Sequence, residues 1–216
     1  MAPMQQLYLA SSIESSAGHI AKRISLRGVS LQVLKAAFIY TAGEIEDDKR
    51  WIDADRDGFK QAGITIFDYT ITGKTAKDLE RDLGDCDLIH VNGGNAFYLL
   101  LQAKKSGFDK FIKKHINKGV IYTGSSAGSM IAGPDIAITW RPENQPYAEA
   151  LPDTRGLNLV DLVIFPHWGS SRFKKIFFSY RLKNAYKKGH KIILLNDDQY
   201  VAVTDGNYKI VDVTKD

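Results

Sequence analysis

The chain has 216 residues, of which 44% are hydrophobic and 25% are charged, and its formal net charge is +4. These values are ordinary for a globular protein, and we expect residues 1–216 to form a single domain. No apolar run reaches the roughly 18 residues that a membrane span needs. A net charge of +4 is too small to indicate nucleic-acid binding.

Short apolar, β-prone runs alternate with helical segments through the first half of the chain. We predict strands over 7–10, 36–40, 64–71, 87–91 and 120–122. Helices are predicted over 20–34, 47–62, 75–83, 96–105 and 108–116. This alternation is typical of an α/β protein with a mostly parallel sheet that is covered by helices on both faces.

The second half of the chain is less regular. Residues 133–153 contain four prolines, and we expect a long loop there. A strand over 159–165, a helix over 173–188 and a strand over 191–195 should follow. Residues 200–203 and 208–213 flank Asp205 and Gly206, a sequence that predicts a C-terminal hairpin.

A turn of small residues follows the apolar strand 120–122. Gly124, Ser126 and Gly128 form the pattern G-x-S-x-G, and residues 129–132 could open a helix. A serine on such a strand-to-helix turn is exposed, and the helix N-terminus favours developing negative charge. Ser126 is therefore a candidate nucleophile, although a turn without catalytic chemistry would have the same sequence.

A serine nucleophile needs an adjacent base, which is usually a histidine. His167 lies between Pro166 and Trp168, directly after a predicted strand. If that strand is parallel to the one before Ser126, both side chains lie at the same carboxyl edge of the sheet. The remaining histidines have surface or packing positions in the predicted elements: His19, His90, His115 and His190.

A second glycine-containing turn, Asn92-Gly93-Gly94-Asn95, also follows a predicted strand. Glycines allow the backbone N–H groups of such a turn to point at a ligand. The amide of Gly94, together with that of Ala127 after the nucleophile, could form an oxyanion hole.

Three stretches in this order resemble the aspartyl dipeptidase (peptidase E) and cyanophycinase family of serine peptidases. They are V-N-G-G-N-A-F-Y-L-L at 91–100, I-Y-T-G-S-S-A-G-S at 121–129, and G-L-N-L-V-D at 156–161 with F-P-H-W at 165–168. The resemblance runs over nearly the whole chain. It implies a flavodoxin-like fold, as in the class I glutamine amidotransferase domain. It also implies that Ser126 is the nucleophile, His167 the base, and Gly94 and Ala127 the oxyanion donors.

The resemblance further implies an acidic third member of the triad, located between the nucleophile and the histidine. Four acidic residues are candidates: Asp135, Glu143, Glu149 and Asp153. Glu143, in I-T-W-R-P-E-N, matches the family's acidic position best by local pattern. We therefore predict a Ser126–His167–Glu143 triad.

Recognition of an acidic substrate residue requires a fixed cation, preferably arginine. Phe178 lies near the position where peptidase E has a substrate-binding arginine, and three arginines could replace it: Arg141, Arg172 and Arg181. Two further residues are candidates for substrate binding, Asn95 and Asp198. Asp197 and Asp198 follow a predicted strand, near an acidic position of the family. They could shape the site or bind a substrate amine, and solvation of a strand end is the alternative.

We expect a serine exopeptidase, a dipeptidase that acts on short peptides and uses neither cofactor nor metal. The single cysteine, Cys86, and the absence of a signal-peptide pattern favour the cytoplasm. Three alternatives remain open: a cyanophycin-like isopeptidase, an esterase of the α/β-hydrolase type and a catalytically inactive binding module of the same fold. A homodimer is one assembly that the sequence allows. We expect no nucleic-acid or membrane partner.

Overall fold

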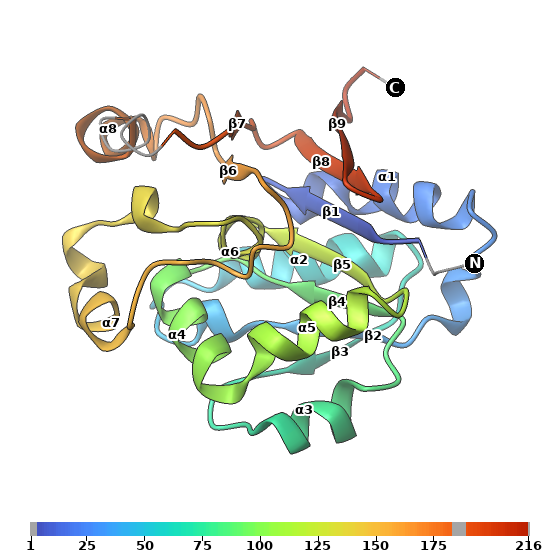
Figure 1. Ribbon diagram of the computed structural model, residues 1–216. Helices are drawn as coiled ribbons and strands as arrows, with labels where there is room; N and C mark the ends of the chain where they lie inside the picture. Colours follow the sequence, from blue (N-terminus) through green and yellow to red (C-terminus); the bar gives the residue numbers. More distant parts are fainter. Residues whose placement is uncertain (1–3, 183–188, 216) are drawn as a thin grey trace.

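The computed structural model describes residues 4–182 and 189–215. Its main sheet has seven strands in the order β3-β2-β4-β5-β1-β8-β9 (Figure 1). Their bounds are Gln6–Ala10 (β1), Ala36–Ile39 (β2), Ile66–Tyr69 (β3), Leu88–Val91 (β4), Ile121–Ser125 (β5), Gln199–Thr204 (β8) and Asn207–Asp212 (β9). Strands β1 to β5 are parallel, whereas β8 and β9 form an antiparallel hairpin beside β1. This flavodoxin-like α/β sheet with a C-terminal hairpin confirms the predicted fold class.

Two short strands form a second, parallel sheet. They are β6 (Val163–Phe165) and β7 (Ile192–Leu194), with Phe165 opposite Leu194. Since the two strands run in the same direction, the residues that follow them leave the sheet at the same edge.

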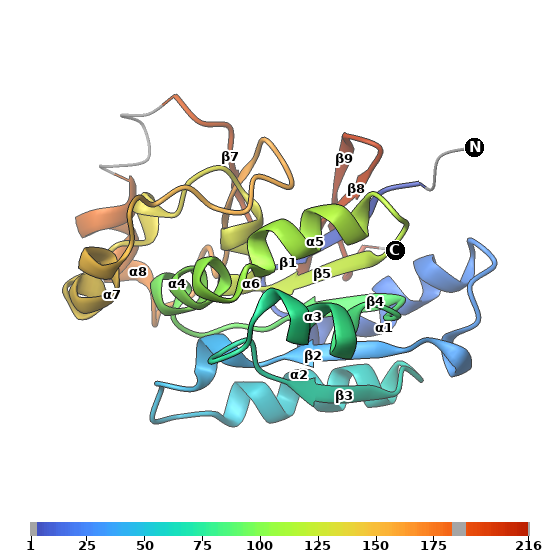
Figure 2. The same ribbon diagram turned by 60° about the horizontal axis from the view of Figure 1, so that its bottom comes forward.

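Helices cover both faces of the main sheet (Figures 1 and 2). One face carries α1 (Ile13–Ser25) and α2 (Arg50–Gln61). The other face carries α3 (Ala76–Leu83), α4 (Ala96–Ser106), α5 (Phe108–Ile116) and α6 (Ala127–Ala132). Two short helices lie outside these layers, α7 (Gln145–Ala150) and α8 (Lys174–Ile176), and α8 continues into a π-helical turn at Phe177–Arg181.

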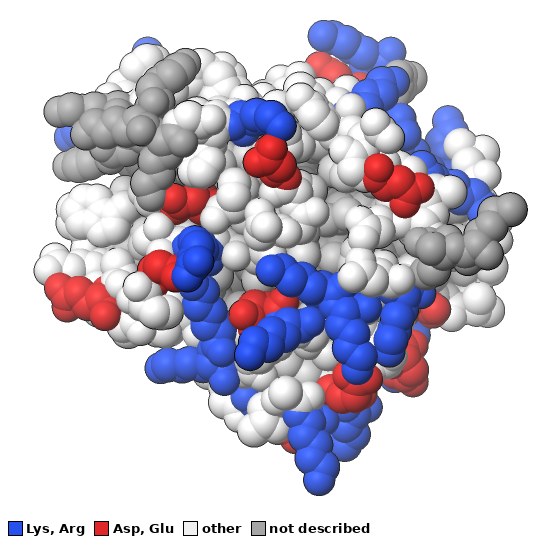
Figure 3. Space-filling view, viewed as in Figure 1, with Lys and Arg blue, Asp and Glu red and all other residues white. Residues whose placement is uncertain are grey.

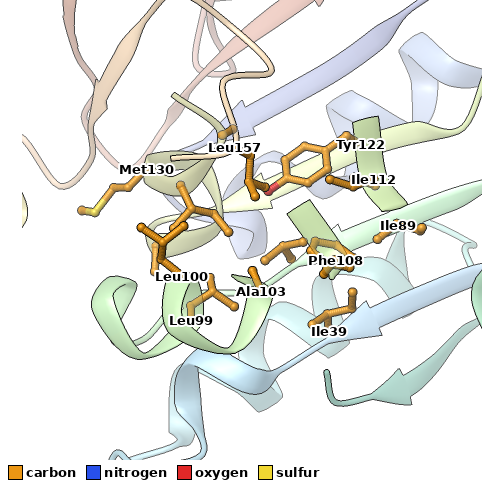
Figure 4. Close-up of a cluster of buried hydrophobic side chains, with 14 of the residues drawn as sticks. Ile39, Ile89, Leu99, Leu100, Ala103, Phe108, Ile112, Tyr122, Met130 and Leu157 are labelled. Carbon is orange, nitrogen blue, oxygen red and sulfur yellow. The ribbon is translucent and has the colours of Figure 1, made fainter. Parts of the chain in front are cut away.

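The larger hydrophobic core lies between the sheet and α3 to α6 (Figure 4). Tyr122 of β5 and Phe108 of α5 are among the largest side chains that are fully buried in it. The hydroxyl of Tyr122 donates a hydrogen bond of 2.7 Å to the carbonyl oxygen of Gly128 in α6. The core therefore holds the sheet and the helix after Ser126 in a fixed relation.

The first helix differs from the sequence-based prediction. It covers Ile13–Ser25 instead of 20–34, with Ser12 at its N-cap position. Apolar residues at helical spacing, among them Ile13, Ile20 and Ile24, are buried against the sheet. Gly28 has φ of 83°, a left-handed conformation that lies outside the helix.

The long loop predicted over 133–153 contains three short helical segments, Ala137–Thr139, Pro142–Asn144 and α7. The helix predicted over 173–188 is present from 174 to 182, and residues 183–188 lie outside the described part of the chain.

Lysine and arginine side chains gather over α5 and α3 on the face shown in Figure 3, with acidic side chains among them. Lys114 of α5, for example, pairs with Glu80 of α3 at 3.0 Å. Among the described residues, no helix is long and apolar enough to cross a membrane.

Candidate active site

The loops that follow β1, β4, β5 and β6 surround a cavity of about 190 Å³. Because these strands end at the same side of the structure, residues far apart in the sequence meet there. The lining includes Ser11 after β1, Gly93 and Gly94 after β4, Ser126 after β5, and His167 after β6.

Ser126 occupies a sharp turn between β5 and α6. Its backbone has φ of 47° and ψ of −106°, which is an uncommon conformation for a residue with a side chain. The Ser126 N–H donates to the carbonyl oxygen of Ala10 at 3.1 Å, and the Ser126 carbonyl accepts from Met130 N–H at 2.9 Å. A Cβ atom on Gly128 would lie 1.9 Å from the carbonyl oxygen of Val91, so only glycine lets α6 approach β4 this closely.

The imidazole of His167 lies between Ser126 and Asp197. Its Nε2 atom is 2.9 Å from Ser126 Oγ, and its Nδ1 atom is 2.6 Å from Asp197 Oδ1. An ionised carboxylate can only accept, so Nδ1 carries the proton and the Ser126 hydroxyl donates to Nε2. The ring also stacks on Phe173, with 4.7 Å between ring centroids. This is the arrangement that makes a serine hydroxyl nucleophilic.

The parallel pairing of β6 and β7 brings His167 and Asp197 together. Leu195 N–H donates to Phe165 O at 3.0 Å, and Trp168 N–H donates to Leu195 O at 2.8 Å. The two chains therefore continue side by side beyond the strands, and His167 and Asp197 follow at the shared edge.

Ser11 connects this pair to β1. Its hydroxyl donates to Asp197 Oδ1 at 2.8 Å and accepts from the His167 N–H at 2.7 Å. Hydrogen bonds from His167 and Ser11, together with the charge of a protonated His167, hold the pKa of Asp197 below its ordinary value, against the opposing effect of partial burial. Asp197 is thus an ionised partner for His167 at neutral pH.

Glu143, the residue predicted to complete the triad, does not occupy that position. It lies exposed in the turn Pro142–Asn144, and the hydrogen bond to His167 Nδ1 is made by Asp197 instead. The other three candidates are engaged elsewhere: Asp135 accepts from Ala137 N–H, Glu149 from Gln145, and Asp153 from Lys104 and Arg155. The signal that could have identified Asp197 is its place after a strand parallel to the one before His167.

The turn with Gly93 and Gly94 lies against the nucleophile. A Cβ atom on Gly93 would be 3.2 Å from Ser126 Cβ. Gly94 has φ of 133°, and a Cβ atom there would be 2.2 Å from Ala42 O, so the turn requires glycine. Ala127 is the first residue of α6, where a backbone N–H has no acceptor within the helix. Amides of this kind can bind an oxyanion.

Two residues predicted to bind substrate have other roles or positions. The Asn95 side chain caps α4 by accepting from Phe97 N–H and Tyr98 N–H at 3.0 Å, and it donates to Asn144 Oδ1 at 2.8 Å. Asp198 is exposed and lies outside the cavity lining. In contrast, Arg141 and Arg172 both line the cavity.

Arg181 is the arginine of this group that the structure sets apart. It is only 5% exposed and lines the cavity, and its Nε and Nη1 atoms have no hydrogen-bond partner among the residues that the structure describes. Its guanidinium lies over the rings of Phe165 and Phe177 at 5.7 and 5.2 Å. Burial and the nearby charge of Arg141 lower its pKa to about 10, so it is still a cation at neutral pH. Phe178, by comparison, is 63% exposed.

In the part of the chain that the structure describes, no three His, Cys, Asp or Glu side chains come together as a metal site requires.

Comparison with known proteins places this geometry in a family. The model of peptidase family S51 matches residues 7–211. The chain belongs to peptidase family S51. It is 30% identical over 204 residues to the uncharacterized peptidase Lin0382 of Listeria innocua, covering 92% of this chain and 96% of that one. It is 31% identical over 212 residues to the uncharacterized peptidase PM1590 of Pasteurella multocida, covering 95% and 100%.

This S51 peptidase also resembles solved structures. A crystal structure from Listeria monocytogenes EGD-e, described as a candidate peptidase E protein, superposes with a TM-score of 0.83 at 27% identity. The match covers 97% of this chain and 98% of that one. The S51 peptidase is therefore a serine-type peptidase, and not an esterase of the α/β-hydrolase type.

Proposed function

We propose that this S51 peptidase is a serine exopeptidase, a dipeptidase of short peptides, and that its triad is Ser126–His167–Asp197. The observation that carries the proposal is the continuous chain of hydrogen bonds from Ser126 Oγ to His167 at 2.9 Å and from His167 to Asp197 at 2.6 Å, at the wall of a cavity.

In the proposed reaction, Ser126 Oγ attacks the scissile carbonyl carbon as its proton passes to His167 Nε2. Asp197 stabilises the imidazolium, and the amides of Gly94 and Ala127 bind the oxyanion. His167 then gives the proton to the leaving amine as the C–N bond breaks, which leaves an acyl ester on Ser126. A water molecule, deprotonated by His167, hydrolyses this ester and regenerates the serine.

The cavity also supports binding of a substrate carboxylate. Arg181 is a buried cation whose Nε and Nη1 atoms have no partner in residues 4–182 and 189–215, and Arg141 lies near enough to lower its pKa. The only carboxylate near Arg141 is that of Glu46, at a distance of 3.9 Å in the described chain. A carboxylate from a short peptide would satisfy Arg181 through paired N–H donors. An acidic side chain or the C-terminal carboxylate of the peptide can fill this role.

A dipeptide-library screen with the wild type and Ser126→Ala tests the proposal. We expect cleavage by the wild type and a loss of turnover on the order of 10⁶-fold in Ser126→Ala, because the triad acts as a unit. Dipeptide cleavage that persists in Ser126→Ala contradicts the assignment.

The same screen with Arg181→Met identifies the substrate carboxylate. We expect kcat/KM to fall by on the order of 10–100-fold for the substrates whose carboxylate Arg181 binds. Arg155→Met is the matched control, because Arg155 is an exposed arginine that pairs with Asp153 outside the cavity. Equal activity of both variants on every dipeptide would exclude Arg181 from substrate binding.

A further inference from the structure

Helix α2 supplies one wall of the cavity through Trp51 and Asp55. The two residues are four positions apart and share a face of the helix, and both line the cavity beside Ser126. Asp55 is only 4% exposed, whereas Asp53 and Asp57 of the same helix are exposed to solvent. Asp55 is therefore a buried carboxylate at the reaction site.

The hydrogen-bond partners of Asp55 are neutral. Its Oδ1 accepts from the Glu14 N–H in the first turn of α1 at 3.1 Å, and its Oδ2 accepts from Ser125 Oγ at 3.1 Å. In the described part of the chain, no Lys, Arg or His forms an ion pair with it. Burial raises the pKa of Asp55 to about 7, and the charge of Glu14 adds to this effect. Among the described residues, Asp55 thus has no counterion.

Trp51 is a second residue of this wall with an unsatisfied polar group. Its Nε1 atom is buried and has no acceptor within the described part of the chain. A Cβ atom built on Gly93 would lie 3.7 Å from Trp51 Nε1 and 3.2 Å from Ser126 Cβ, so the free donor is close to the nucleophile. A buried N–H without an acceptor is costly unless a ligand supplies one.

We propose that Asp55 binds the α-ammonium group of the substrate and thereby makes the enzyme select peptides with a free amino terminus. This inference rests on the proposed peptidase function and adds the group that recognises one end of the substrate. An ammonium group brings the counterion that the carboxylate lacks and three N–H donors for its remaining lone pairs. Since Ser125, which contacts Asp55, is adjacent to the nucleophile, binding here places cleavage near the amino end. Trp51 Nε1 is then free to donate to a carbonyl of the same substrate.

Glu46 is the other acidic residue of the cavity lining, and its surroundings differ. Its carboxylate is 3.9 Å from the guanidinium of Arg141, so it already has a cation nearby. Asp55 is the carboxylate of the lining that lacks one.

The test compares each dipeptide that the wild type cleaves with its des-amino analogue, which lacks the α-amine and adds no bulk. We expect the wild type to prefer the free amine by on the order of 100-fold in kcat/KM. Asp55→Asn keeps the shape but not the charge; its amide oxygen can still accept from the Glu14 N–H, and its NH2 group can donate to Ser125 Oγ, which then accepts. This variant should reduce the ratio by on the order of 10–100-fold. Asp57→Asn makes the same change on the exposed face of α2 and should leave the ratio as in the wild type.

Two results would overturn the proposal. One is an equal loss on both substrates in Asp55→Asn, which would mean that Asp55 only caps α1 and supports Ser125. The other is a ratio that survives in Asp55→Asn and is lost in Glu46→Gln. Failure of the peptidase proposal is recognised separately, because Ser126→Ala would then retain cleavage of both compounds.

The pH dependence of the ratio gives a second test. The preference for the free amine should rise as the pH increases through about 7, because the Asp55 carboxyl ionises there. Other charged groups lie near the wall, and they act on the ammonium group but not on the des-amino analogue. They are Glu14 on α1 and, in the cavity lining, Glu46, Arg141, His167, Arg172 and Arg181. The same pH series with Asp55→Asn contains their contribution without that of Asp55, so the difference between the two series reports on Asp55. A ratio near one, or a ratio that stays constant between pH 5.5 and about 7, contradicts the proposal.

Discussion

Asp197 fixes the orientation and the tautomer of His167. Its Oδ1 atom is 2.6 Å from His167 Nδ1 and accepts a second hydrogen bond from Ser11 at 2.8 Å. With Nδ1 protonated, Nε2 is left to accept the Ser126 proton, which is the state that catalysis requires.

Asp197→Asn should therefore lower kcat by on the order of 10⁴-fold, since the amide would favour the wrong tautomer of His167, as the same substitution does in other serine peptidases. Steady-state kinetics with a cleaved dipeptide measures this loss. Glu143→Gln is the comparison variant and should change kcat by less than about threefold, because surface side chains outside the site rarely matter. A large loss in Glu143→Gln with a small one in Asp197→Asn would restore the triad predicted from the sequence.

Asp55 should also affect stability in a pH-dependent way. Its pKa is about 7 in the folded protein and 3.8 as the reference for the unfolded chain. Between these values the folded state binds more protons than the unfolded state, so the free energy of unfolding falls as the pH rises. Asp55→Asn lacks this ionisation. Its stability relative to the wild type should increase between pH 4 and pH 8, by on the order of a few kcal/mol.

Urea unfolding of both proteins at pH 4.5 and pH 8 measures this difference. A stability difference that does not change with pH would show that the Asp55 carboxyl titrates normally. If the stability of Asp55→Asn relative to the wild type is larger at pH 8 than at pH 4.5, the fold maintains a destabilising carboxylate beside the nucleophile.

The turn between β5 and α6 depends on the close packing of α6 against β4. Ser126 holds an unfavourable backbone conformation, and Gly128 makes the close approach that keeps the turn in place. The nucleophile is thus positioned by helix packing as well as by its own hydrogen bonds.

Gly128→Ala should destabilise the protein by about 3 kcal/mol and reduce activity, because its Cβ atom would meet the Val91 carbonyl. Gly18→Ala in α1 is the control. Nothing lies within 4 Å of its added Cβ atom, and alanine should stabilise this exposed helical position by roughly 0.5–1 kcal/mol. Thermal unfolding and kcat of both variants are the measurements. Wild-type stability of Gly128→Ala would show that α6 can move away from β4 at no cost.

Local sequence patterns identified most of the strands of the main sheet and most of the helices that cover it. The apolar runs before Ser126 and before Gly93 predicted β5 and β4. The turn residues after each run predicted where the strand ends. The partner of His167 was not predictable in this way. It depends on the parallel pairing of β6 with β7, strands that lie about 30 residues apart and form their own sheet. Local pattern instead favoured Glu143, which is exposed in the turn Pro142–Asn144.

The whole active site spans both sheets. Ser11 and Ser126 come from the main sheet, whereas His167 and Asp197 come from β6 and β7. We predicted a single domain, and if that prediction holds, the two sheets should unfold together.

Equilibrium urea unfolding tests this prediction with two probes. Far-UV circular dichroism follows all helices, and tryptophan fluorescence follows Trp51, Trp140 and Trp168. We expect one midpoint for both probes and for the loss of activity, since a cooperative domain unfolds in a single transition. Fluorescence and activity that change before the circular dichroism would show that β6 and β7 form a separately unfolding unit.

Mass spectrometry of the protein after treatment with a fluorophosphonate tests the central geometry most directly. Such a probe loses fluoride when an activated serine hydroxyl attacks its phosphorus. We predict a single adduct on Ser126, absent in Ser126→Ala and formed far more slowly in His167→Ala and Asp197→Asn. An unlabelled Ser126, or labelling that is just as fast without His167, would contradict the account.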